Sequence, residues 1–338
     1  MLTDDGSVNS NLVSEFTSYF SDNIGGRSEL AYLYTGLGFK AFRQSANQRI
    51  GLGVDDWFFC YYGKSTYSSL WQDYQNDELP DEIEQIYKDL SERNIEFYFV
   101  MPPTKTFVYP EKAYYGNFNG DYIYPTKYIT EELNRRGVPA HDLTDAVKQA
   151  KAETGNQMWF KYDGHWNDVG SWYGYKELYQ YLSEFGVTDG DLPQVSFTPA
   201  KAYRADLLAQ LNGLKLPEED MMLRNTKNPQ AVRIYEGELW NRLQLLASTY
   251  GWRDLGPNAS PVSYWQNPWQ AGGKRVLLVM DSLFADLSSN VGQGSIAPLL
   301  AENVTELVAV WYAYEPDQID ALIEAYKPDV VIYEKAIL

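Results

Sequence analysis

The chain has 338 residues, which is long enough for one large α/β domain or two smaller ones with a sizeable core. Its formal net charge of −18 repels polyanions, and no cluster of Lys and Arg opposes this charge, so the sequence argues against a nucleic-acid partner. Aromatic residues make up 15% of the chain, and such amphipathic rings suit stacking on sugars as well as ordinary packing.

Cysteine usage and hydropathy limit the cellular compartments in which the protein is expected. Cys60 is the only cysteine, so an intramolecular disulfide is excluded, as in a cytosolic protein or a disulfide-free secreted protein of Gram-positive type. It lies in the apolar run W-F-F-C-Y-Y, which predicts a buried rather than a reactive thiol. No window reaches 18 apolar residues and the first ten residues are polar, so no membrane anchor is expected in the chain as given.

The N-terminal segment predicts helices followed by a hairpin. Residues 11–47 are amphipathic and break at Gly25-Gly26, which indicates two helices. In the second helix the apolar residues at helical spacing are Leu30, Leu33, Leu37 and Phe42. Residues 49–62 alternate and end in aromatics, which predicts a β-hairpin that turns at residues 54–56.

The first buried strand is expected at Ile95–Met101, after a helix from Pro80 to Arg93 whose first turn is acidic. Ligands of doubly wound sheets lie outside the carboxyl ends of the strands, so the following loop, Pro102–Lys105, is a candidate site by position. Lys105 is therefore a candidate for substrate or oxyanion binding, and the alternative is an ordinary solvated lysine.

The middle of the chain alternates helices with a short strand. Helices are expected at 125–136, 143–153 and 167–185, and a strand at 138–142. Residues 187–270 are irregular apart from a helix at 236–250. This segment is interpreted as an insertion or lid on the sheet rather than an independent domain, so that residues 1–338 form a single domain.

The C-terminal part completes the expected sheet. Strands are predicted at Arg275–Met280, Thr305–Trp311 and Asp329–Tyr333, with a helix at Pro316–Tyr326. Their apolar runs are continuous rather than alternating, which indicates strands buried on both faces and hence a mostly parallel sheet in an α/β fold.

One of the chain's two histidines lies in a setting suited to catalysis. His165 stands in F-K-Y-D-G-H-W-N, two residues after Asp163, and imidazole is the side chain that titrates unaided near neutral pH. His165 is therefore the candidate general base. The rival, His141, lies in V-P-A-H-D-L at a strand end, where a hydrogen-bonded structural histidine is the more usual interpretation.

A candidate nucleophile follows the strand that ends at Met280. In M-D-S-L-F, Ser282 stands at a strand-to-helix turn, where α/β hydrolytic folds expose a serine. Alone this pattern more often marks an ordinary helix-capping serine. A nucleophilic serine needs a base, and the base needs an acid that fixes its tautomer, so Ser282 gains weight from the D-G-H loop.

The D-x-H and D-S elements resemble those of the SGNH hydrolase superfamily. With D-G-H-W-N-D-V-G at 163–170 placed before the serine, this permuted order resembles the alginate O-acetyltransferases AlgX and AlgJ and the DHHW proteins of Gram-positive bacteria. Further segments resemble theirs at Glu15–Asn23 with Arg27, Gly53–Phe59, Pro102–Glu111 and Lys327–Glu334.

The resemblance implies a three-layer α/β/α sandwich and a set of roles. Ser282 would be the nucleophile, with its backbone N–H as an oxyanion donor, His165 the base and then acid, and Asp163 its orienting partner. Trp166 would line the site or brace the loop. Substrate or oxyanion binding is also assigned to Asp281 and Tyr312.

The resemblance also implies partners and a location. Family members move acetyl groups onto or off hydroxyls of extracellular polysaccharides, usually while anchored by an N-terminal helix that this chain lacks. A glycan substrate, an acetyl donor that a membrane partner could supply, an extracellular or cell-surface location and no cofactor are therefore expected.

Two alternatives to a serine-dependent acetyltransferase or acetylesterase stay open. One is a non-catalytic scaffold that binds glycan, favoured by the bulky Met280 and Leu283 around the D-S element. The other is a metal hydrolase that uses Asp163 and His165, for which two ligands at this spacing are too few.

Overall fold

The computed structural model describes most of the chain. The described residues are 27–42, 45, 47, 50–60, 78–113, 125–202, 218–252, 261–285, 294–311 and 313–336, with no side chain described for 27–32 or 202. The helix predicted before Gly25 and the candidate residue Tyr312 lie outside this part.

Seven strands of the described chain form one central sheet in the order β4-β3-β11-β9-β10-β8-β7. The parallel strands are β4 (Ala140–Asp142), β3 (Glu96–Met101), β11 (Val330–Glu334), β9 (Arg275–Met280) and β10 (Glu306–Trp311). Next to β10, β8 (Val262–Gln266) runs antiparallel, and β7 (Val232–Ile234) pairs antiparallel with β8. The mostly parallel sheet expected from the apolar runs is confirmed.

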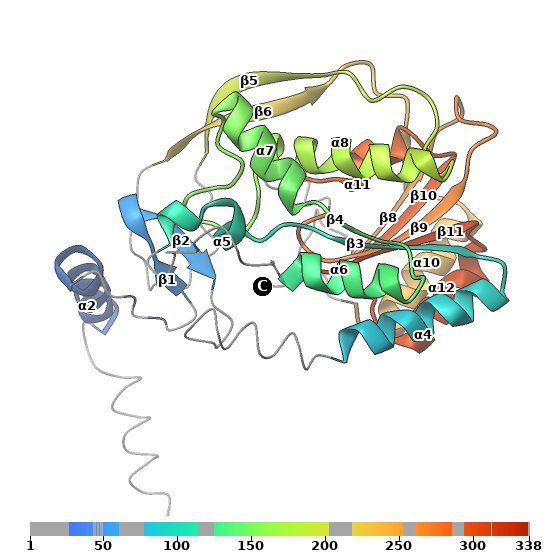
Figure 1. Cartoon of the computed structure of the whole chain (residues 1–338), viewed down its shortest axis with the longest axis horizontal. Coiled ribbons are helices and arrows are strands. Elements are labelled where there is room, and N and C mark those ends of the chain that lie inside the picture. Colours follow the sequence, from blue (N-terminus) through green and yellow to red (C-terminus); the bar gives the residue numbers. More distant parts are fainter. Residues whose placement is uncertain are drawn as a thin grey trace, which may run out of the picture.

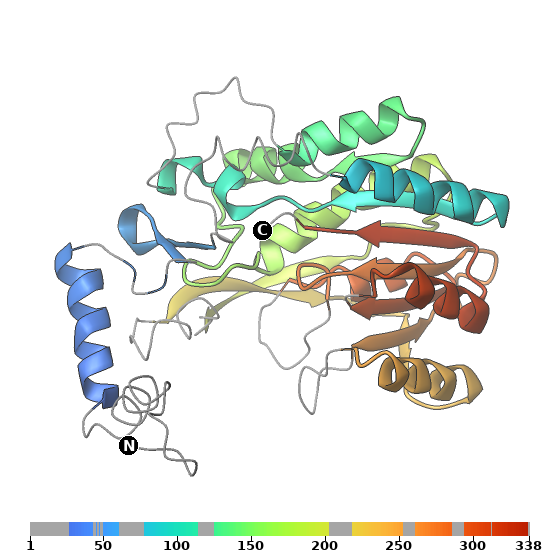
Figure 2. The ribbon, with the colours of Figure 1, turned by 90° about the horizontal axis from the view of Figure 1, so that it is seen from below.

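Helices cover both faces of this sheet (Figures 1 and 2). One layer contains α7 (Thr144–Thr154), α8 (Asp168–Glu184) and α11 (Ala297–Ala301), and the other contains α4 (Leu79–Glu92), α6 (Pro125–Arg135), α10 (Glu238–Thr249) and α12 (Pro316–Tyr326). Alternate residues of a strand enter the two cores: Leu278 packs toward α8, and its neighbours Leu277 and Val279 pack toward α12. The fold is therefore a three-layer α/β/α sandwich.

The segment 187–270 is more regular than its sequence indicates. Besides α10, it holds the antiparallel ribbon of β5 (Val195–Ala202) and β6 (Glu219–Thr226), which runs along the α7–α8 layer in Figure 1. It also supplies β7 and β8 to the central sheet. The prediction of an irregular insertion is corrected, because short or one-sided strands mix polar and apolar residues and carry no continuous apolar run.

The N-terminal part precedes the sandwich in sequence and lies at one end of it (Figures 1 and 2). The predicted hairpin is confirmed as β1 (Ile50–Leu52) and β2 (Phe58–Cys60), joined through the short helix η1 (Val54–Asp56). Helix α2 (Arg27–Phe42) contacts it through Phe39, whose ring lies 5.6 Å from that of Phe58. The side chains of Leu33, Leu37 and Phe42 are exposed, so the apolar face expected of this helix is not covered in the described chain. No helix among the described residues is long and apolar enough to cross a membrane.

Candidate active site

The candidate residues gather at the carboxyl edge of the parallel strands. β3 ends at Met101, β9 at Met280 and β11 at Glu334, and parallel strands end at the same edge of a sheet. Helix α5 (Lys105–Val108) follows β3, and the turn that carries Ser282 follows β9. The location agrees with the rule that α/β sheets bind ligands at this edge.

The base loop, defined here as residues 158–167, is a closed hairpin. Trp159 and Trp166 form an isolated antiparallel bridge, and the backbone N–H of Asn167 donates to the carbonyl oxygen of Met158 at 3.0 Å. Asn167 then caps α8, because its Oδ1 accepts from the N–H groups of Val169 and Gly170, each at 3.0 Å. His165 thus lies inside a hairpin that the bridge closes and that leads directly into a capped helix.

Asp163 and His165 form a buried hydrogen-bonded pair within the base loop. Asp163 Oδ1 lies 2.7 Å from His165 Nδ1 and accepts the backbone N–H of His165 at 2.9 Å. The Asp163 side chain is 1% exposed and that of His165 is 15% exposed. A neutral imidazole that donates Nδ1–H to Asp163 carries its acceptor lone pair on Nε2, which is the arrangement of a general base oriented by an acid.

Lys105 supports the base loop from beneath. Its Nζ donates to the carbonyl oxygens of Phe58 at 2.6 Å, Lys161 at 2.9 Å and Asp163 at 3.0 Å. The ammonium also lies 5.0 Å from the ring centre of Trp57, and the residue is only 6% exposed. An ammonium has three N–H donors, and these carbonyls engage all three, so the predicted substrate contact is corrected to a structural role.

A second buried polar residue ties the β5–β6 ribbon to the same loop. Glu219 Oε2 accepts the backbone N–H of Lys161 at 2.7 Å and the side-chain amide of Gln157 at 3.1 Å. Burial raises the pKa of Glu219 above that of an ordinary glutamate, and the hydrogen bonds from Lys161 and Gln157 partly oppose this shift. The ribbon therefore fixes the loop as well as packing against α8.

The turn after β9 is organised by Asp281. Its Oδ1 accepts the N–H of Leu283 at 2.8 Å across Ser282, and its Oδ2 accepts the N–H of Ala336 at 2.8 Å. The backbone N–H of Asp281 donates to Glu334 Oε2 at 2.7 Å. Asp281 is 4% exposed, so the substrate or oxyanion contact predicted for it is corrected: the side chain shapes the turn that presents the half-buried Ser282.

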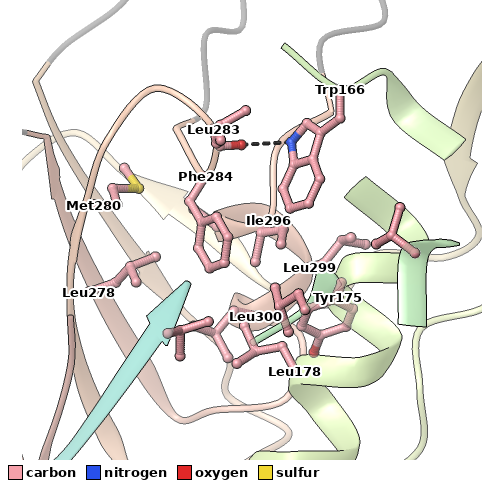
Figure 3. Packing of buried hydrophobic residues seen from close by; sticks show 14 of the residues in the cluster. Trp166, Tyr175, Leu178, Leu278, Met280, Leu283, Phe284, Ile296, Leu299 and Leu300 are labelled. Carbon is pink, nitrogen blue, oxygen red and sulfur yellow. Dashed lines mark hydrogen bonds between the residues drawn. The ribbon is translucent and has the colours of Figure 1, made fainter. Parts of the chain in front are cut away.

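Trp166 joins the two halves of the site. Its Nε1 donates to the carbonyl oxygens of Leu283 and Gly294, both at 2.8 Å (Figure 3 draws the first), and its ring stacks on Phe284. Trp166 is fully buried, so it braces the loop rather than lining the site. The absence of a side chain at Gly294 lets its backbone lie close to the base loop, since a Cβ there would lie 2.3 Å from the carbonyl oxygen of Asn167.

The bulky neighbours of Ser282 point into the core. Met280 and Leu283 are both buried in the cluster drawn in Figure 3, between the sheet and α8. Their volume is therefore taken up by packing below the turn. The sequence alone suggested that this volume would crowd the nucleophile.

The second histidine is engaged elsewhere. His141 Nε2 lies 2.8 Å from Glu177 Oε1, and its ring stacks on Tyr181 with 4.3 Å between ring centres. These partners include neither Asp163 nor Ser282. No group of three or more His, Cys, Asp or Glu side chains in the described chain is placed to hold a metal ion.

Sequence reasoning missed three residues that build the site, namely Glu219, Asn167 and Glu334. Each makes its contacts through a buried polar group. For Glu334 a signal was present, because a carboxylate closes the otherwise apolar strand V-V-I-Y-E. For Asn167 the signal was the N-cap residue type just before a helix.

The three-layer sandwich, with the D-G-H loop before the serine in sequence, defines an SGNH hydrolase-like protein. Residues 50–239, more than half of the chain, match the family described as "SGNH hydrolase-like domain, acetyltransferase AlgX". The chain therefore belongs to that family. No curated protein matches it in sequence.

Solved structures with the same fold include those of two other bacterial proteins. The O-acetyltransferase domain of Pseudomonas putida AlgJ is 19% identical, with 85% of this chain and 90% of that chain covered and a TM-score of 0.51. Bacillus cereus PatB1 is 17% identical, with 83% and 94% covered and a TM-score of 0.53. PatB1 with a sulfonyl adduct gives 18% identity, 85% and 95% coverage and a TM-score of 0.52. At these identities the likeness establishes the fold.

Proposed function

We propose that the chain is a serine-dependent O-acetyltransferase or acetylesterase that acts on a cell-surface or extracellular polysaccharide. The observation that carries this proposal is the Asp163–His165 pair on a loop that Trp166 fixes to the Ser282 turn. Membership of the AlgX acetyltransferase family supports the reaction type.

In the proposed first half-reaction, Ser282 Oγ attacks the acetyl carbonyl carbon while His165 Nε2 takes the hydroxyl proton. The bond to the leaving group then breaks, and His165 returns the proton to that group, which leaves acetylated Ser282. The backbone N–H of Ser282 is the proposed donor to the oxyanion of the tetrahedral intermediate. Asp163 holds the imidazole tautomer and stabilises the imidazolium.

In the second half-reaction a sugar hydroxyl or a water molecule attacks the acetylated serine. His165 takes the proton of the attacking group, the ester bond to Ser282 breaks, and the proton passes back to Ser282 Oγ. The products are an acetylated sugar or acetate and the starting enzyme. General-base help of this kind contributes about 10²- to 10⁴-fold in rate.

The glycan substrate and the location belong to the same proposal. The high aromatic content suits sugar stacking, and a polysaccharide acceptor implies that the enzyme acts where such polymers are exposed. Digestion of intact cells with an added protease tests the location. Loss of the chain from intact cells supports a surface position, and full protection until lysis contradicts it.

The non-catalytic alternative drew its sequence support from Met280 and Leu283. Both side chains are buried in the core below the turn, which removes the steric argument for that alternative. The catalytic proposal is therefore preferred.

The test compares acetate release from a chromogenic acetate ester by the wild type, Ser282→Ala and His165→Ala, with His141→Ala as the matched histidine control. We expect the first two variants to lose hydrolysis and the control to retain it. Equal hydrolysis by all four proteins contradicts the proposal. Mass spectrometry of an oligosaccharide acceptor then distinguishes transfer to sugar from transfer to water.

A further inference from the structure

Two carboxyl groups meet directly beneath the Ser282 turn. Glu334, the last residue of β11, is 0% exposed, and its Oε2 accepts the backbone N–H of Asp281. Both Asp281 oxygens accept backbone N–H groups, from Leu283 and Ala336, each at 2.8 Å. Glu334 Oε1 is buried, and no group among the described residues donates a hydrogen bond to it.

One proton accounts for this arrangement. Two adjacent carboxylates in a buried site cannot both ionise without a large cost, and the described chain contains no ion pair of either group with Lys or Arg. Asp281 accepts two backbone N–H groups and Glu334 accepts one, so the negative charge is better stabilised on Asp281. A proton on Glu334 Oε1 turns the unmatched acceptor into a donor aimed at the Asp281 carboxylate.

The electrostatic balance points the same way. Burial raises the pKa of Glu334 well above its usual range, and the neighbouring Asp281 adds to that shift. Burial also raises the pKa of Asp281, but the hydrogen bonds from Leu283 and Ala336 and the charge of His165 oppose that rise. The last effect also means that Asp281 lies close enough to His165 for their charges to interact.

We propose that Glu334 is a positioning residue for the Ser282 reaction: it stays protonated, shares its proton with ionised Asp281, and thereby holds the nucleophile turn with a single negative charge. This inference rests on the proposed function. The single charge on Asp281 interacts favourably with the imidazolium that His165 becomes when it takes the serine proton. A second charge on Glu334 would repel Asp281 and loosen the turn.

The other titratable groups around the pair are already engaged. After β10, the Tyr314 hydroxyl donates to the backbone carbonyl oxygen of Glu334 at 3.0 Å. Next along the chain, Lys335 Nζ lies over the Tyr314 ring and 3.9 Å from Glu82 on α4. From β3, the backbone carbonyl of Val100 accepts the N–H of Lys335. His165 on the base loop lies within electrostatic range of Asp281.

Two substitutions separate this role from simple space filling. Glu334→Gln keeps a carbonyl for Asp281 N–H and an amide donor for the Asp281 carboxylate. Glu334→Met fills the same volume but leaves the Asp281 N–H without a partner. We expect Glu334→Gln to retain acetate-ester hydrolysis at neutral pH and Glu334→Met to lose about 10-fold or more. We also expect the wild type to lose activity at alkaline pH through a titration that Glu334→Gln lacks.

An infrared difference spectrum of wild type minus Glu334→Gln gives a readout that needs no activity. The inference predicts the carbonyl stretch of a protonated carboxylic acid in the wild type at neutral pH and its absence in the variant. If that band is absent, or if Glu334→Gln loses hydrolysis as fully as Glu334→Met, the inference is overturned. If the band is present but Ser282→Ala matches the wild type in hydrolysis, the shared proton stands and the proposed catalytic function fails.

Discussion

The indole nitrogen of Trp166 donates a hydrogen bond to the backbone carbonyl oxygen of Leu283 at 2.8 Å. The residue after His165 is thereby fixed to the residue after Ser282, although 117 positions separate them in the chain. Because Trp166, Leu283 and Gly294 are all buried, water cannot readily replace the indole as the donor to these two carbonyls. Trp166 therefore links the candidate base directly to the turn of the candidate nucleophile.

Replacing Trp166 with Phe should uncouple the two halves of the site while keeping an aromatic ring. The carbonyls of Leu283 and Gly294 lose their donor, so we expect the free energy of unfolding to fall by about 1–3 kcal/mol, with a clear loss of acetate-ester hydrolysis. Urea denaturation and kinetics measure the two effects. Trp172→Phe, on α8 and half-buried, is the matched control and should change stability by less than about 1 kcal/mol. Equal effects of both substitutions would refute the special role of Trp166.

Lys105→Met should destabilise the base loop. Three backbone carbonyls lose a charged donor inside the protein, so the free energy of unfolding should fall by about 3 kcal/mol, and hydrolysis should fall with it. The control is Lys112→Met, whose ammonium contacts the exposed Asp55, and a surface ion pair of this kind contributes little to stability. A Lys105→Met protein as stable as the control would contradict the structural role.

Asp163→Asn should act on chemistry more than on folding. The asparagine oxygen can still accept the N–H of His165, but the neutral amide no longer favours Nδ1–H or stabilises the imidazolium. We expect kcat to fall by about 10³- to 10⁴-fold with KM little changed, as for loss of the oriented tautomer in a serine triad. Steady-state kinetics with a chromogenic acetate ester measure this, and an unchanged kcat would remove Asp163 from the mechanism.

Because the pKa of Glu219 is raised, we expect the free energy of unfolding to depend on pH. Its pKa is raised by burial, so between the ordinary glutamate value of about 4.3 and the raised value the folded chain binds more protons than the unfolded chain. Its contribution to the free energy of unfolding is therefore fully present below that ordinary value and is lost as pH rises through the raised pKa.

Glu219→Gln has no such titration. Its stability relative to the wild type should therefore increase with pH across that interval, by at most about 1.4 kcal/mol per pH unit. Urea denaturation at several pH values measures the difference, and Glu218→Gln at an exposed neighbouring position controls for the loss of one carboxylate. A difference between Glu219→Gln and wild type that stays constant with pH would rule out the raised pKa.

The sheet core could be predicted because its strands are apolar on both faces. R-V-L-L-V-M in β9 and E-L-V-A-V-W in β10 carry the continuous runs that only a strand between two helical layers needs. β7 has only three residues, with Val232 exposed, and Pro199 interrupts the pattern of β5. Their strand character depends on the partners they pair with, which composition does not encode.

The candidate site, like the sheet, was only partly predictable from the sequence. The Asp163–His165 pair was accessible to sequence reasoning because both partners lie on one short loop. The contacts of Lys105 reach residues 47, 56 and 58 positions away, and a buried lysine is uncommon enough that an exposed one was the natural expectation. Glu334 and Asp281 likewise meet only once β11 and β9 pair.

The most direct test of the central claim is covalent labelling of the purified protein with a sulfonyl fluoride, followed by peptide mass spectrometry. The mechanism predicts a single adduct on Ser282 in the wild type, none in Ser282→Ala, and much slower labelling in His165→Ala. An adduct elsewhere, no adduct, or an unchanged labelling rate in His165→Ala would contradict a serine nucleophile activated by His165.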